Sequence, residues 1–284
     1  MKNASSLFQI HLAVIFFGLS GLFGKWIDLP PSLITWGRCS FAFLALFILI
    51  LFSKERFGLK RASHYCIFAG LGALLALHWW SFFHSIQIST VAIGLLTFST
   101  FPVFTVFLEP LFFKEKISWR DIVAALVTVG GIACIVPAFD LNHSTTVGVI
   151  FGILSGLSFA VLQIVNRKYV QTYSGRLITF YQTGIAALAL LPAVSFAENS
   201  FSLPSVGMLM VLGILCTATA HSLFINGLRS VKVRSASVIA GLEPVYGIVF
   251  AMLFLHELPS WKEICGGAVI LSAALWVSIK KSID

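Results

Sequence analysis

The feature that most constrains this chain is a series of ten apolar runs, each about long enough to cross a lipid bilayer. A crossing helix needs about 20 mostly apolar residues. The runs cover residues 7–27, 32–53, 63–85, 90–112, 119–138, 146–166, 177–197, 205–228, 235–255 and 261–279. Only 11% of the 284 residues are charged, against about 25% in a typical soluble domain. We therefore expect an all-α polytopic membrane protein with ten transmembrane helices.

The lysines and arginines predict how these helices are oriented. If the N-terminus is cytoplasmic, 16 of the 19 basic residues fall in cytoplasmic segments, and Lys262 lies in an outer loop. Lys25 and Arg38 lie within apolar runs. Because short basic loops stay in the cytoplasm, we expect a multi-pass protein of a bacterial inner membrane with both termini cytoplasmic. This distribution explains the net charge of +8 without a nucleic-acid partner.

The chain contains an internal repeat. FPVFTVFLEPLFFKEKISWRDI (101–122) aligns without gaps with EPVYGIVFAMLFLHELPSWKEI (243–264), and 8 of 22 positions are identical at an offset of 142 residues. Shared proline, glutamate, serine and tryptophan residues are not explained by apolar composition alone. Gly18-Leu19-Ser20 also reappears as Gly156-Leu157-Ser158. We predict two five-helix repeats, residues 1–142 and 143–284.

Five is an odd number of spans, so the second repeat enters the membrane from the opposite side. An inverted repeat is the plan of many secondary transporters, whose substrate site lies near the membrane midplane between the halves. Each half has a mid-helix proline, then an acidic residue at the following loop and a glycine-rich closing helix. With ten spans, this pattern resembles the EamA-type transporters of the drug/metabolite transporter superfamily, over essentially the whole chain. Glu243-Pro244 matches the family pattern, whereas Phe101-Pro102 and the additional Glu109-Pro110 depart from it.

Small residues and prolines mark candidate packing or hinge positions. Gly18, Gly21 and Gly24 follow one another at intervals of three residues, and small residues let membrane helices approach closely. They favour either plain helix packing or a contact that shifts beside a cavity. Pro102 and Pro244 are expected to distort their helices near the middle of the membrane.

Charged residues inside apolar runs are the strongest candidates for a functional site. For Lys25, snorkelling to the outer interface is the simpler interpretation. Arg38 lies deeper and either has a structural role or binds a carboxylate or phosphate of a substrate. Glu243 is expected to couple transport to protons or another cation, or to bond backbone carbonyls freed by Pro244. Glu109 is expected to lie near the inner face beside Lys114.

Polar and aromatic residues recur at matching positions of the two halves. Trp79 pairs with His221, and His84 with Asn226, at the same offset of 142. Trp80 and His84 are one turn apart and share a helix face. These residues favour a substrate pocket, although interhelical hydrogen bonds would use the same residue types. The full set of candidate cavity residues is Ser20, Arg38, His78, Trp79, Trp80, His84, Ser99, Gln163, Asn166, Gln182, His221 and Tyr246.

The leading hypothesis is a secondary transporter that moves a small metabolite by alternating access, without a cofactor or a bound metal. The family resemblance implies an amino acid or related compound, with efflux as the first expectation. It also implies an alternative, the import of a vitamin or a nucleotide-like metabolite. The sequence leaves open a monomer or a homodimer. An intramembrane hydrolase that uses Ser20 with His78 or His221, and a membrane scaffold that transports nothing, are the hypotheses from other classes.

Overall fold

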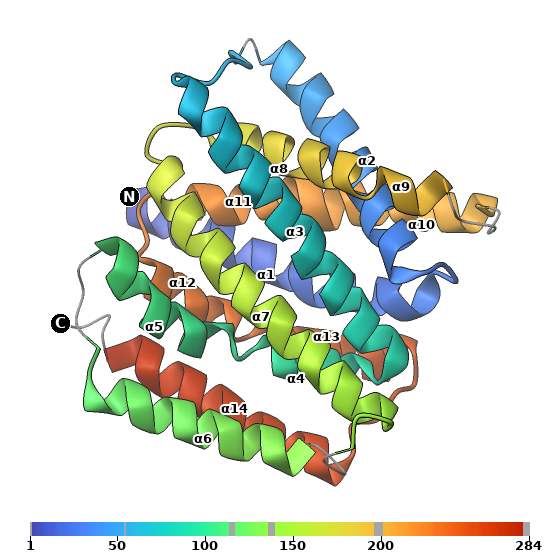
Figure 1. Ribbon diagram of the computed structural model, residues 1–284, viewed down its shortest axis with the longest axis vertical. Coiled ribbons are helices and arrows are strands. Elements are labelled where there is room, and N and C mark those ends of the chain that lie inside the picture. The colour runs from blue at the N-terminus through green and yellow to red at the C-terminus, as the bar shows by residue number, and fades with distance from the viewer. Residues whose placement is uncertain (1, 54, 114–116, 136–139, 196–200, 281–284) are drawn as a thin grey trace.

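The computed structural model describes residues 2–53, 55–113, 117–135, 140–195 and 201–280 (Figure 1). Within these ranges the regular structure is entirely helical. The helices are α1 (Lys2–Trp26), α2 (Pro31–Phe52), α3 (Ala62–Ile88), α4 (Val91–Phe98), α5 (Phe101–Phe113), α6 (Trp119–Ile135), α7 (Ser144–Tyr169), α8 (Gly175–Ala189), α9 (Leu191–Ser195), α10 (Leu203–Gly213), the π-helix η1 (Ile214–Thr219), α11 (Ala220–Gly227), α12 (Val233–Ala240), α13 (Glu243–Phe254) and α14 (Trp261–Lys280).

Seven helical stretches of the described residues are long and apolar enough to cross a bilayer. They are Ser5–Trp26, Pro31–Phe52, Ala62–Ile88, Val91–Phe113, Ser144–Tyr169, Leu203–Gly227 and Ser235–Phe254. Large apolar side chains such as Phe8, Phe52 and Leu126 are exposed on the outside. In water such a surface would be unfavourable, whereas lipid solvates it. The expected runs 119–138, 177–197 and 261–279 contain α6, the pair α8 and α9, and α14.

Three of the expected spans are interrupted, and one of them, 177–197, breaks at Leu190 between α8 and α9. The run 90–112 breaks at residues 99–100 between α4 and α5, and the run 235–255 breaks at 241–242 between α12 and α13. Pro102 and Pro244 are the second residues of the helices that follow. Proline is favourable in a first helical turn because its missing N–H has no partner there. Each proline therefore lies in the first turn of a new helix and not in the middle of a continuous one.

Helix boundaries repeat along the chain at the offset found in the sequence. Starts at 91, 101 and 119 for α4, α5 and α6 correspond to starts at 233, 243 and 261 for α12, α13 and α14, and each difference is 142. α6 and α14 pack side by side (Figure 1). A Cβ on Gly131 would lie 2.9 Å from the Gly266 carbonyl oxygen, so glycine is required where these two backbones meet.

The interior of the molecule lies where α1, α3, α7 and α11 meet. α3 and α7 pack along much of their length, and α1 contacts both α11 and α13. A large cluster of buried apolar side chains fills this region. The clustering brings the middle of the first helix against the broken helix of the second half, and the candidate site forms at this junction.

Candidate functional site

A small cavity lies in the interior, and we call it the central cavity. It is lined by Phe17, Ser20, His78, Trp79, Phe82, Phe98, Phe159, His221 and Glu243. Its volume is about 20 Å³, and a single water needs about 10–15 Å³ measured in this way. In this conformation the central cavity therefore accommodates water but no metabolite.

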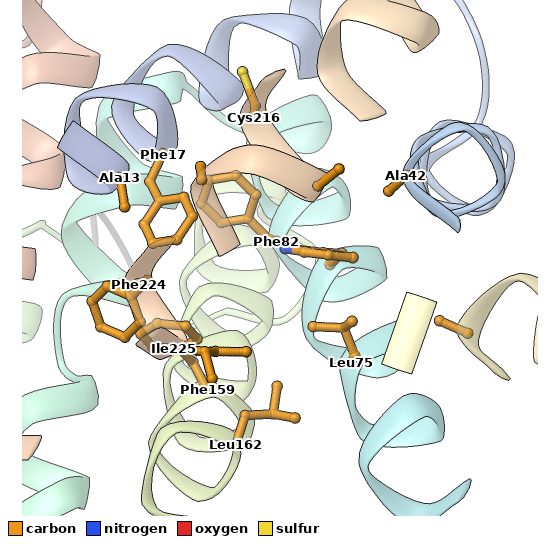
Figure 2. Packing of buried hydrophobic residues seen from close by; sticks show 14 of the residues in the cluster. Ala13, Phe17, Ala42, Leu75, Phe82, Phe159, Leu162, Cys216, Phe224 and Ile225 are labelled. Carbon is orange, nitrogen blue, oxygen red and sulfur yellow. The ribbon is translucent and has the colours of Figure 1, made fainter. Parts of the chain in front are cut away.

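The aromatic side chains at and around the central cavity include two pairs related by the repeat offset. Figure 2 shows Phe17, Phe82, Phe159 and Phe224 converging from α1, α3, α7 and α11. Phe17 and Phe159 are 142 residues apart, as are Phe82 and Phe224. The ring centroid of Phe224 lies 5.6 Å from that of Phe17 and 5.9 Å from that of Phe159. Phe17 and Phe159 line the central cavity from corresponding positions of the two halves, whereas Phe224 packs against them outside the lining.

Trp79 is the central aromatic side chain, with a different charged or polar group on each side. The Arg38 guanidinium carbon lies 3.9 Å from the centroid of its ring, well within cation–π range. The His221 ring lies 5.4 Å from the Trp79 ring. Trp79 and His221 occupy corresponding positions of the repeat, and the structure places them in contact.

Arg38 lies behind the cavity wall and does not line the central cavity. It is 1% exposed, and its Nε donates a hydrogen bond of 3.0 Å to Thr217 Oγ1 in η1. Its Nη1 is buried and has no hydrogen-bond partner. A guanidinium stays charged in proteins. The structure therefore holds a fixed positive charge one layer behind the Trp79 ring.

Glu243 is the acidic residue of the central cavity and the first residue of α13. It is 4% exposed, and its Oε2 is buried without a hydrogen-bond partner. Among the described residues no ion pair joins Glu243 to Arg38. An unpaired buried carboxyl oxygen is costly. A cation or a hydrogen-bond donor of a bound ligand would satisfy this oxygen.

His78 is anchored to α7. Its Nδ1 lies 3.0 Å from the Ser155 carbonyl oxygen and 2.9 Å from Ser155 Oγ. Its ring stacks on Phe159 at 5.2 Å. Ser20 lines the central cavity, but within the described part of the chain no hydrogen bond joins it to a histidine. The nucleophile–base pair that a hydrolase requires is thus not formed here.

Trp80 and His84 lie on another face of α3. Their rings stack at 5.6 Å, in agreement with their one-turn spacing, and the ring of Phe151 lies 4.5 Å from His84. Neither residue lines the central cavity. The helix turns them towards α7 away from Trp79, because neighbouring residues of a helix point about 100° apart.

The other candidate residues join helices around the cavity. Gln163 Nε2 donates to Thr105 Oγ1 at 3.1 Å, which links α7 to α5. Gln182 Nε2 donates to Asn166 Oδ1 at 2.6 Å, which links α8 to α7. None of these side chains lines the central cavity.

Two further candidates lie at or beside the helix breaks. Ser99 Oγ donates to the Leu95 carbonyl oxygen at 2.9 Å and ends α4. Tyr246 is half-buried and packs against the apolar core beside α1. Neither side chain lines the central cavity.

The three glycines of α1 differ in how closely they are packed. A Cβ on Gly18 would lie 2.8 Å from Tyr246 Cβ and 3.0 Å from the Glu243 carbonyl oxygen. A Cβ on Gly24 would lie 3.0 Å from Ile86 Cγ2. On Gly21 the nearest atom would be 3.6 Å away, an ordinary contact. Gly18 alone of the three brings α1 against the first turn of α13.

Two charged residues near the ends of the helices have clear partners. Lys25 Nζ donates to the Ser89 carbonyl oxygen at 2.8 Å, at the end of α3. Glu109 Oε1 pairs with Arg167 Nη1 at 3.0 Å. We expected Glu109 beside Lys114, which lies outside the described residues. Arg167, 58 positions away, reaches Glu109 because α5 packs against α7.

Sequence reasoning missed the phenylalanines at and around the central cavity. It also missed Ser155 and Thr217, the hydrogen-bond partners of His78 and Arg38. The chain has 27 phenylalanines, so composition does not single out any four of them. The offset of 142, applied to phenylalanines, would have identified the pairs Phe17/Phe159 and Phe82/Phe224. No such signal marks Ser155 or Thr217, because their roles depend on helices that are distant in the sequence.

Comparison with known proteins agrees with this architecture. The model of the EamA-like transporter family matches residues 4–136 and again residues 146–279. An uncharacterized transporter of Archaeoglobus fulgidus is 31% identical over 197 residues, which are 69% of this chain and 70% of that protein. The S-adenosylmethionine uptake transporter of Rickettsia bellii is 27% identical over 219 residues, which are 75% of this chain and 73% of that one.

A solved structure shows the same fold. It matches with a TM-score of 0.73 at 16% identity, and the match covers 99% of both chains. With two family matches, apolar helices of membrane length and relatives named as transporters, this multi-pass membrane protein belongs to the EamA-like transporter family of the drug/metabolite transporter superfamily.

Proposed function

We propose that this protein is a secondary transporter of ten membrane spans, built as two inverted five-helix halves, 1–142 and 143–284. The repeated helix boundaries and the paired cavity residues support this arrangement. The distribution of basic residues supports a place in the inner membrane with both termini cytoplasmic. A site between two inverted halves is the place where such a transporter binds its substrate.

The substrate is a small metabolite that carries a positively charged group, an amino acid or a related compound. The observation that carries this proposal is the buried Oε2 of Glu243, which has no partner and faces a cavity with aromatic walls. A carboxylate and aromatic faces both attract an ammonium or a sulfonium group. His221 Nε2 is likewise buried without a partner and supplies a polar group for the rest of the molecule.

Export is the leading direction, as the family resemblance implies. Import is the second candidate, because relatives are named as S-adenosylmethionine uptake transporters. S-adenosylmethionine joins an amino acid to a sulfonium, so its charges fit the same cavity. The hydrolase hypothesis has no comparable support, since Ser20 lacks a histidine partner among the described residues.

Transport requires the central cavity to open towards each side in turn. Its volume of about 20 Å³ is far below the roughly 300 Å³ at which ligand pockets begin. In the proposed alternating-access cycle, we take this conformation as a closed state. We infer that α1 shifts against α13, because the two backbones meet at glycines: a Cβ on Gly18 would lie 3.0 Å from the Glu243 carbonyl oxygen, and one on Gly247 would lie 3.1 Å from the Gly18 carbonyl oxygen.

Glu243 also supports coupling to protons. A carboxyl group that binds a cationic substrate in one state and a proton in the other exchanges the two across the membrane. In this proposal His78 forms part of the cavity wall and does not carry the proton, because its Nδ1 is already bonded to Ser155.

The test is uptake into proteoliposomes that contain the purified protein. Labelled methionine, lysine, S-adenosylmethionine and a nucleobase are offered with and without an imposed pH gradient. We expect protein-dependent flux for a compound with a positive group. Its N-acetylated analogue should compete about tenfold more weakly, because it has lost one charge-assisted contact. Equal competition by the acetylated analogue would remove the carboxylate-based recognition, and no flux from folded protein for any member would favour a scaffold.

A further inference from the structure

A second hollow of the molecule lies far from the central cavity, at the ends of α3 and α7. It is lined by Lys60, Arg61, His64, Ile67, Lys168 and Tyr169, with Ser63 and Thr172 at its edge. Its volume is about 550 Å³. None of these described lining residues is acidic. We call it the basic pocket.

The cations of the basic pocket differ from other basic residues at the same end of the molecule. Arg167 is paired with Glu109, Arg176 Nη2 lies 3.6 Å from Glu55 Oε2, and Arg229 donates to two backbone carbonyls. The side chains of Lys60, Arg61 and Lys168 have no ion pair or hydrogen bond within the described part of the chain. Basic residues that only set the orientation in the membrane do not need to lie close together. These three line one hollow although they come from segments about 100 residues apart.

The wall of the basic pocket is held in place by Tyr173. Its hydroxyl accepts a hydrogen bond from the Lys60 backbone N–H at 2.9 Å and bonds His64 Nδ1 at 2.5 Å. The His64 ring also packs edge-on against Tyr169 at 5.1 Å. The segment before α3 is thereby tied to the end of α7. The backbone that carries Lys60 and the His64 ring are thus held in place, which reduces the ordering cost of binding an anion.

The basic pocket adjoins an apolar part of α3. Ile67 forms part of its lining. Gly70 lies on the same face of α3 one turn further, and nothing lies within 4 Å of a Cβ built on it. A hollow with cations that adjoins an open apolar helix face matches a phosphate group that is joined to an acyl chain.

We propose that the basic pocket binds the phosphate of an anionic phospholipid headgroup, with the acyl chains along α3 past Gly70. Basic pockets between membrane helices bind anionic headgroups on the cytoplasmic side, and guanidinium and ammonium groups both contact phosphate oxygens. The proposal is independent of the transported substrate, because Glu243 and the central cavity take no part in it.

The test measures lipid bound to the purified full-length protein by native mass spectrometry in detergent. Palmitoyl-oleoyl phosphatidylglycerol is compared with the zwitterionic phosphatidylcholine of the same chains. We expect phosphatidylglycerol to be retained preferentially by the wild type. In the variant K60Q/R61Q/K168Q this retention should fall by well over tenfold, because each basic residue near a membrane surface contributes about fivefold.

Two variants separate the pocket from general charge. R56Q removes a positive charge from the same region but lies outside the basic pocket, and it should retain the lipid. K168Q changes one exposed side chain, leaves folding intact and should lower retention about fivefold. Equal retention by K168Q and R56Q would overturn the proposal.

A soluble arm identifies the source of the phosphate. Glycerol 1-phosphate is added at millimolar concentration in place of lipid, and the melting temperature of the protein is followed. We expect no stabilisation by glycerol phosphate and a rise of melting temperature with phosphatidylglycerol that K168Q reduces. Stabilisation of the wild type by glycerol phosphate as large as that by the lipid would assign the pocket to a soluble phosphate and overturn the lipid proposal.

Discussion

The break between α4 and α5 and the break between α12 and α13 are the same backbone feature used twice. They fall at residues 99–100 and 241–242, which are 142 residues apart, and each is followed by a proline at the second helical position. The backbone geometry follows from Pro102 and Pro244, since neither has an N–H to continue the preceding helix. The side chain that each break places in the interior is therefore free to differ.

That side chain is Phe101 in the first break and Glu243 in the second. Phe101 is 0% exposed and packs edge-on against Phe159 at 5.1 Å. Glu243 lines the central cavity with an unpaired oxygen. Phe101 itself does not line the central cavity, so the two breaks contribute differently to it. The asymmetry teaches that one half supplies a packed wall and the other a single charged group, which suits a single cationic ligand.

The largest effect is expected when an acidic residue replaces Phe101, at the break between α4 and α5. F101E removes a buried ring, which costs about 3–5 kcal/mol, and adds an uncompensated buried charge. We expect little folded protein by size-exclusion chromatography in detergent. F101L, which stays apolar, should remain folded. A stable F101E protein would mean that the first break is wet and that the two breaks are equivalent.

The reverse change should affect function and leave stability intact. E243Q removes the charge that the proposed cationic substrate contacts, and charge-assisted hydrogen bonds contribute about 1.5–3 kcal/mol. Flux should fall about tenfold or more, while the melting temperature stays the same or rises because a buried charge has been removed. D140N, a change of an exposed loop acid, is the charge-matched control. Normal flux in E243Q, with its dependence on the pH gradient intact, would exclude Glu243 from the mechanism.

The two breaks also show how far the sequence can be read. The apolar runs and the offset of 142 predict where the helices lie and which positions correspond. They do not predict that the helices end at residues 98 and 240, because a proline within an apolar run is compatible with a kink or with a new start.

For the candidate site, residue type predicted Trp79, His78, His221 and Glu243 at the central cavity. Residue type did not distinguish them from Trp80, which is also aromatic but lies on another face of α3. It also did not place Arg38 one layer behind Trp79. Those distinctions depend on how α3 is rotated against its neighbours, and the packing of the whole bundle sets that rotation.

A third prediction tests whether α13, which begins at Glu243 after the second break, must stay in close contact with α1. G18A introduces a Cβ 2.8 Å from Tyr246 Cβ, whereas the Cβ of G21A would have ordinary contacts from 3.6 Å. Overpacking costs about 1–3 kcal/mol, so G18A should lower the melting temperature and reduce flux roughly fivefold. G21A should keep both. Equal behaviour of the two variants in parallel thermal and flux assays would show that α1 does not depend on close packing at Gly18.

The smallest expected effect distinguishes His78 from His84, two of the three histidines of α3. The His78 ring is tilted against the ring of Phe98, the last residue of α4, with the ring centroids 5.6 Å apart. H78Q loses that ring and the fixed geometry of the bond to Ser155, so flux should fall about threefold, as for one neutral hydrogen bond. His84 contacts Trp80 and Phe151 away from the central cavity, so H84Q should change flux by less than about twofold, within the usual range of substitutions away from a site. Initial rates at matched protein levels measure both. A larger loss in H84Q than in H78Q would place the substrate path on the opposite face of α3 and would leave the contrast between the two breaks without a functional meaning.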